Sequence, residues 1–126
     1  VSVGLVAGDG GALIWPQLIG YAKAKRYLFT GDLLTAAEAE RIGLISEVVP
    51  EADLDSRVYG LAEQLAAGPL KAMKWTKVVA NLPLKALFHA HFDAGVAYES
   101  MSNLSADHQE AVAAFREKRK PAFTGK

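Results

Sequence analysis

The sequence predicts a mostly α-helical chain with two short β-strands, and three observations support this. Apolar residues recur every three or four positions over most of the 126 residues, which is the spacing of one helix face. Two short runs, residues 1–7 and 44–50, are instead rich in β-branched residues, as strands are. No tandem repeat or linker divides the chain. Because two strands cannot form a sheet with a face of its own, the chain is either an all-α domain with two stray extended segments or part of an α/β fold whose sheet lies upstream.

The first expected element is a buried strand that runs into a glycine turn. Residues 1–7 are mostly apolar, and three glycines follow between Gly8 and Gly11. Glycine permits positive φ angles and a close approach of the backbone to another group. The residues after the turn, 12–15, predict a short helix, in whose first turns Pro16 is tolerated.

Two helices and the second strand are expected next. An amphipathic pattern over residues 21–30 predicts a helix that ends at the following glycine. Thr35 and Glu38 have the spacing of a capping box, in which the Thr hydroxyl accepts from an exposed amide and the Glu side chain reaches back to the cap. The helix that opens there ends at Gly43, and residues 44–50 then predict a strand closed by proline.

The rest of the chain predicts four helices. Apolar spacing indicates the first over residues 52–68 and the second over residues 70–80, which Pro83 interrupts. The third spans residues 84–101 and carries a near-heptad apolar stripe. Ser105 caps the last helix, which ends before a Lys-Pro pair.

Composition and charge exclude several classes of protein. The 14 Lys and Arg residues balance 14 Asp and Glu residues, so the chain lacks the basic excess of a general nucleic-acid binder. Its longest apolar runs fall far short of the ~20 residues that a membrane span needs. The absence of cysteine excludes disulfides, thiolate nucleophiles and Cys-based metal sites, and it fits a reducing compartment. We therefore expect a cytoplasmic protein.

Five segments spread along the whole chain carry a family resemblance. They are Gly-Leu-Val-Ala-Gly-Asp-Gly-Gly at 4–11, Thr-Gly-Asp with Thr-Ala-Ala-Glu-Ala over 30–39, Gly-Leu-Ile at 43–45, Val-Val-Pro at 48–50, and Phe-Arg-Glu-Lys-Arg-Lys-Pro-Ala-Phe at 115–123. In order and spacing they resemble the crotonase superfamily, the enoyl-CoA hydratases and isomerases. The combination is much more specific than any one segment.

The resemblance implies that the chain is the C-terminal half of a longer protein. In that family a repeated strand–strand–helix spiral of the α/β class binds acyl-CoA, and C-terminal helices pack into a trimer. We accordingly expect residues 1–66 to end the spiral core and residues 67–126 to form a helical region for oligomerisation, into a trimer or a dimer of trimers. The family's oxyanion hole and catalytic glutamates would precede Val1, so the isolated chain is expected to lack hydratase activity.

The function implied by the resemblance is that of an acyl-CoA-processing enzyme that stabilises a thioester enolate. It would be a lyase or isomerase of fatty acid metabolism, with no cofactor beyond the coenzyme A of its substrate. Its expected partners are acyl-CoA and other copies of the chain, and neither nucleic acid nor a membrane. The alternative is a helical interaction or trimerisation module without catalysis of its own, which would assemble through the stripe of residues 84–101 and the C-terminal helix. Binding of CoA would favour the enzyme, and self-association without ligand would favour the module.

The glycine turn holds the first candidate site residues. The resemblance implies that the backbone amide of Gly8 helps to position the reacting water and that the turn, including Gly10, lies beside the acyl chain, which Trp15 would also line. Asp9 departs from the family pattern, in which a small residue is usual. Its carboxylate could cap the following helix. It could also move a proton at the carbons next to the thioester, which would favour isomerase or decarboxylase chemistry over hydration.

Phe115 and Lys118 are the second pair of candidates. The resemblance implies that they approach the adenosine end of CoA, where an aromatic face suits adenine and a lysine suits phosphates. Without a ligand they would be a core aromatic residue and a solvated base. His89 and His91 lie two positions apart and therefore point about 200° apart on a helix, so they cannot share a metal ion there and no metal site is expected.

Overall fold

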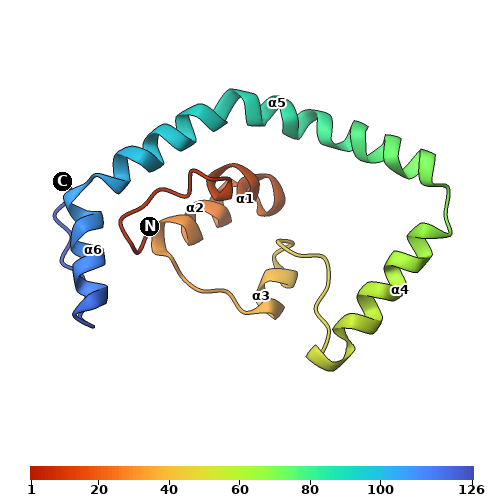
Figure 1. The fold of residues 1–126 in the computed structure, drawn as a ribbon, viewed down its shortest axis with the longest axis horizontal. Coiled ribbons are helices and arrows are strands. Elements are labelled where there is room, and N and C mark those ends of the chain that lie inside the picture. Colours follow the sequence, from red (N-terminus) through yellow and green to blue (C-terminus); the bar gives the residue numbers. More distant parts are fainter.

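The computed structural model describes residues 1–126 and contains six α-helices, one short 3₁₀ helix and no β-strand. In chain order these are α1 (Gly11–Ile19), α2 (Tyr21–Thr30), α3 (Ala36–Arg41), η1 (Glu51–Asp53), α4 (Leu54–Ala66), α5 (Leu70–Asn103) and α6 (Ala106–Arg116). Figure 1 shows the long α5 arching over the α1–α2 pair, with α6 at one end of the arch and α4 at the other. The principal contacts join α1 to α2, α1 to α5, and α5 to α6, whereas α4 has an extensive contact only with η1.

The two predicted strands are absent, so this part of the fold prediction is wrong. A strand needs a neighbouring strand to pair with its backbone groups, and neither segment has one. Residues 1–7 instead use side chains of the C-terminal helices: the Val6 amide donates to Ser102 Oγ at 3.1 Å, and the Val3 carbonyl accepts from His108 Nδ1 at 2.8 Å. Within residues 44–50, the Val48 amide donates to Glu40 Oε1 at 3.1 Å.

The predicted break at Pro83 is also wrong, because α5 runs without interruption from Leu70 to Asn103. A proline inside a helix removes one hydrogen bond and costs about 3 kcal/mol relative to alanine. Its neighbours in α5 are mostly good helix formers, and the helical hydrogen bonds on both sides offset this cost. Pro16 likewise lies inside α1 rather than at its start.

Helix caps follow the sequence closely at two positions. Thr35 precedes α3 and its Oγ1 accepts from the Glu38 amide at 3.2 Å, which confirms half of the capping box. The other half is wrong, since the Glu38 carboxylate pairs with Arg41 at 2.7 Å instead of returning to the cap. Ser105 caps α6 by accepting from the His108 amide at 3.1 Å, as predicted.

The apolar core is small and is formed by residues of the first half of the chain. Ile19, Ala24 and Ile42 are buried, and half-buried Trp15 and Tyr27 pack against them with three leucines. Neither α4 nor α5 contains a buried residue. The tertiary contacts of the chain are therefore concentrated where α1, α2 and the C-terminal half of α5 meet.

None of the helices combines the length and apolar character that a membrane crossing requires.

Candidate active site

A backbone contact between two glycines joins the glycine turn to α5. A Cβ added to Gly8 would lie 2.2 Å from the carbonyl oxygen of Gly95, and one added to Gly95 would lie 2.9 Å from the carbonyl oxygen of Gly8. Real Cβ atoms do not approach other atoms this closely, so both positions need glycine for packing. The absence of side chains here brings the turn, which is otherwise a surface loop, directly against the helix.

An apolar pocket of about 250 Å³ opens beside this contact. The turn and the start of α1 provide one wall, which includes Val6, Gly10 and Leu13. The other wall belongs to α5, with Phe92 as its largest apolar side chain and Phe88 stacked on it at 4.4 Å between ring centroids. Concave pockets with mostly apolar walls are where small molecules bind in proteins.

The turn leaves the Asp9 carboxylate exposed and without a hydrogen-bond partner in the chain. The residue that caps α1 is Gly10, with φ of 140°, and no side chain accepts from the first amides of that helix. The interpretation of Asp9 as a helix cap is therefore wrong. Asp9 stands between two residues that line the pocket, Gly8 and Gly10, although it does not line the pocket itself.

Trp15 lies away from this pocket. Its ring packs edge-on to Tyr27, with the centroids 6.4 Å apart and the planes at 69°, against the core residue Ile19. Of the residues predicted around the acyl chain, the structure thus brings Gly8 and Gly10 together and places Trp15 in the core beneath them.

Two polar side chains of α5, His91 and Tyr98, line the pocket and were not identified from the sequence. The Nδ1–H of His91 donates to the Leu87 carbonyl oxygen at 2.9 Å, one helical turn earlier. His91 precedes Gly95 by four positions and Tyr98 follows it by three, so the three residues share one face of α5. A glycine inside an apolar helical stripe was the available signal, because it marks a close backbone approach.

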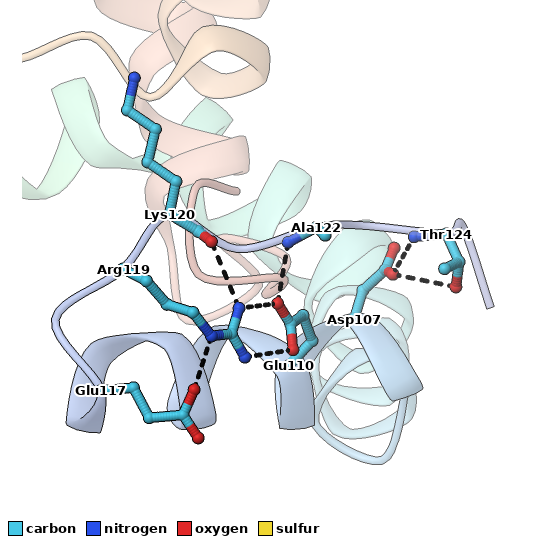
Figure 2. A network of polar contacts seen from close by, with 7 residues as sticks. All are labelled: Asp107, Glu110, Glu117, Arg119, Lys120, Ala122 and Thr124. Atoms are coloured by element: carbon cyan, nitrogen blue, oxygen red, sulfur yellow. Dashed lines mark hydrogen bonds and ion pairs between the residues drawn. The ribbon is translucent and has the colours of Figure 1, made fainter.

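The C-terminal segment is held along α6 by a network of carboxylates. Figure 2 shows the Arg119 guanidinium paired with Glu110 and, through Nε at 2.6 Å, with Glu117. Glu110 also accepts from the Ala122 amide at 2.9 Å, and Asp107 accepts from the Thr124 amide at 2.7 Å. The hydrogen bonds from Arg119, followed by that from Ala122, lower the pKa of Glu110 from 4.5 to about 2.

Phe115 and Lys118 lie at the end of α6, and neither lines the pocket. Phe115 is 85% exposed, so the alternative of a core aromatic residue does not hold within this chain. Lys118 adopts a left-handed conformation with φ of 55°, the one non-glycine residue of the chain with a positive φ. The exposed ring and ammonium are available to a ligand or to a neighbouring surface.

The structure contains no group of three or more His, Asp or Glu side chains that could hold a metal ion. His89 and His91 follow different faces of α5, and only His91 lines the pocket. Around this pocket the chain itself provides backbone amides, the His91 imidazole, the Tyr98 phenol and the nearby Asp9 carboxylate.

Comparison with known proteins shows which family this chain matches. The family profile of enoyl-CoA hydratase/isomerase matches residues 1–126. An enoyl-CoA isomerase/hydratase of Mycosarcoma maydis is 34% identical over 127 residues, covering 100% of this chain and 46% of that protein. The 1,2-epoxyphenylacetyl-CoA isomerase of Escherichia coli is 32% identical over 124 residues, covering 98% of this chain and 47% of that protein.

Solved structures show the same relationship. The crystal structure of an enoyl-CoA hydratase/isomerase from Pseudoalteromonas atlantica superposes with a TM-score of 0.89 at 31% identity, covering 98% of this chain and 50% of that one. The chain thus spans about half the length of the curated relatives that it matches. Its architecture is that of the corresponding part of a crotonase-like fold. By sequence and by structure, the chain belongs to the enoyl-CoA hydratase/isomerase family.

Proposed function

We propose that the protein is an acyl-CoA-processing enzyme of the hydratase or isomerase kind, and that the pocket between the glycine turn and α5 receives the acyl group. The observation that carries this proposal is the contact of Gly8 with Gly95 beside an apolar pocket of about 250 Å³. It brings backbone groups, without side chains in the way, to the wall of a cavity of suitable size and polarity.

Within this proposal the residues of the turn have separate roles. The Gly8 amide positions the reacting water or substrate, and Gly10 lines the acyl group. Asp9, between them and without a structural partner, is the candidate proton-transferring group of the turn. The oxyanion hole for the thioester and the catalytic glutamates belong, in this proposal, to the half of the relatives' length that the match does not cover.

The end of α6 provides the contact with the coenzyme A moiety in the proposed complex. Phe115 is 85% exposed, so its face is free to stack on adenine, and Lys118 presents an ammonium group for phosphates. Trp15 packs against the core, so in this proposal it supports the position of the turn or contacts the far end of a long acyl chain. A cytoplasmic location, expected from the absence of cysteine, is part of the same proposal.

The test uses Ala94, which lines the pocket and whose helix continues on both sides of it. Ala94→Trp should fill the pocket and reduce the turnover of a short 2-enoyl-CoA at least tenfold in the native full-length protein, followed by the absorbance of the conjugated thioester. Ala97→Trp is the matched control, since Ala97 is exposed on the same helix and does not line the pocket. Absence of binding and turnover for every acyl-CoA, or equal effects of the two substitutions, would contradict the proposal.

A second candidate function is assembly, favoured by the exposed apolar residues of α4 and the first half of α5. Trp75 is 67% exposed and Val79 is 64% exposed, and no other helix covers them. Isolated monomers seldom leave an extended apolar face in water. We propose that this face packs between copies of the chain, in a trimer or a dimer of trimers, whether or not the chain also binds acyl-CoA.

A further inference from the structure

His91 is the one imidazole on the wall of the apolar pocket, and its tautomer follows from its hydrogen bond. The Leu87 carbonyl can only accept, so the nitrogen that lies 2.9 Å from it, Nδ1, carries the hydrogen. In the tautomer with its hydrogen on Nδ1, the other ring nitrogen, Nε2, is an acceptor. No group of the chain donates to Nε2, which leaves it available to a molecule in the pocket.

The position of His91 sets where on a ligand such a contact would fall. The turn side of the pocket, with Gly8 and Gly10, holds the reacting end in the function proposed above. His91 projects from α5 on the opposite wall, one turn before the point where Gly95 touches Gly8. Its nearest large neighbour in the pocket wall, Phe92, is apolar and offers a ligand no competing hydrogen bond. His91 therefore lies on the wall opposite the reacting end, where the distal part of an acyl group would reach.

The pocket extends from the glycine turn to α5 and has a volume of about 250 Å³. An acyl group that enters it with its reacting end at the turn would carry its distal end toward the wall of α5.

We infer that the preferred substrate is an acyl-CoA whose acyl group carries a hydrogen-bond donor, most simply a hydroxyl, at its distal end, and that Nε2 of His91 accepts from it. This inference rests on the proposed function, since it specifies the substrate of the same pocket. His91 is a specificity-determining residue in this role. A hydrocarbon chain of the same length leaves Nε2 without a partner, whereas the hydroxylated chain satisfies it.

The test is a binding measurement with two unreactive acyl-CoA thioesters of the same acyl length, one unsubstituted and one with a terminal hydroxyl. Calorimetry on the native full-length protein should show the hydroxylated ester binding about fivefold more tightly. His91→Leu should abolish this preference, and His91→Gln should restore part of it because the amide oxygen still accepts. His89→Leu, two residues away on the same helix and outside the pocket, should retain the full preference.

The outcomes separate the two proposals. Equal binding of both esters to the unaltered protein, or a preference that survives in His91→Leu, would overturn the inference and leave the acyl-CoA function standing. Failure of the protein to bind either ester would overturn the proposed function and the inference together. A preference lost equally in His89→Leu and His91→Leu would show a general effect on α5 and would also overturn the role of His91.

Discussion

The two ends of α5 differ in the contacts that they make with the rest of the chain. At the C-terminal end the helix meets the glycine turn and α6, and every buried residue of the chain lies between Gly8 and Ile42 or in α6. At the N-terminal end, α4 and the first half of α5 leave Trp75 and Val79 about two-thirds exposed, at 67% and 64%. The covered region is thus the one in which α5 packs on the glycine turn and α6, although Tyr98 and Met101 stay 62% and 65% exposed there. The open region is the one in which α4 and the first half of α5 leave an apolar face without a neighbouring helix.

This difference separates two tasks along one helix. The pocket lies entirely within the covered region, so its shape depends on contacts inside the chain. The open region has no pocket of comparable apolar enclosure, and its side chains are arranged as a face and not as a cavity. Ligand binding and assembly are therefore expected to respond to different substitutions.

The largest effect is expected on the oligomeric state, when a charge is placed in the open apolar face. Val79→Asp places a charge in the middle of the exposed apolar face, and burying an unpaired charge between subunits is strongly unfavourable. The native full-length protein should change in solution from an oligomer, expected to be a trimer, to a monomer or an aggregate, as measured by light scattering. Lys77→Asp on the same helix is the control and should leave the mass unchanged. An unaltered mass for soluble Val79→Asp would show that this face takes no part in assembly.

In the covered region, Gly8→Val should give the largest loss of stability. The added Cβ would meet the Gly95 carbonyl at 2.2 Å, and the turn would have to move away from α5. Forcing extra methyl groups into a packed contact costs typically about 1–3 kcal/mol, so the free energy of unfolding should fall by this amount and acyl-CoA binding should weaken with it. Chemical denaturation provides the measurement.

The matched control for this glycine lies in the open region. Gly60 is inside α4, and a Cβ built there meets nothing within 4 Å. Gly60→Ala should therefore raise the free energy of unfolding by roughly 0.5–1 kcal/mol, because alanine is the better helix former. A loss of stability in Gly60→Ala, or none in Gly8→Val, would contradict the division of the chain into a covered and an open region.

Asp9→Asn tests whether the glycine turn contributes to the chemistry separately from its contribution to stability. The Asp9 carboxylate caps nothing, so the melting temperature should stay almost unchanged. Asparagine cannot transfer a proton, and loss of a positioned acid or base typically costs about 10²–10⁴-fold, so turnover of the true acyl-CoA substrate should fall at least tenfold. Equal turnover by both proteins would remove Asp9 from the chemistry and leave it as a surface carboxylate.

The smallest effect is expected at Glu110, whose contacts with Arg119 and the Ala122 amide hold the C-terminal segment along α6. The pKa of Glu110 in the folded chain is about 2, below its ordinary value of 4.5, because Arg119 and the Ala122 amide donate to the carboxylate. Since the folded-state pKa is the lower one, this contribution to stability is fully present above the unfolded value and is lost as the pH falls toward about 2. Glu110→Gln should lower the melting temperature slightly near neutral pH and match the unaltered protein near pH 2. A constant difference across this range would assign the effect to packing.

Local signals in the sequence predicted most of the helices. Ser105 and Thr35 cap α6 and α3 because a hydroxyl next to exposed amides acts through a few neighbouring atoms. Gly31, with φ of 68°, ends α2 for an equally local reason. Such features depend on residues within one helical turn, so they can be identified without knowing the tertiary structure.

Features that depend on distant partners were missed or misjudged. Residues 1–7 have the composition of a strand, but strand formation needs a pairing neighbour that composition does not reveal. The pocket could not be predicted either, because it requires Gly8 and Gly95 to meet across 87 positions, the difference between the two residue numbers. The sequence places His91 in the stripe of residues 84–101 and excludes a metal site shared with His89, but only the fold shows that His91 lies opposite the glycine turn.

The most direct test of the proposed pocket is hydrogen–deuterium exchange of the native full-length protein with and without a bound acyl-CoA. Ligand in the pocket should slow exchange at the amides of residues 8–13 and 91–98, whereas α4 should exchange at an unchanged rate. The two protected segments are distant in sequence and are brought together by the contact of Gly8 with Gly95. Binding of acyl-CoA without protection of either segment, or with protection confined to α4, would contradict the assignment of this pocket to the acyl group.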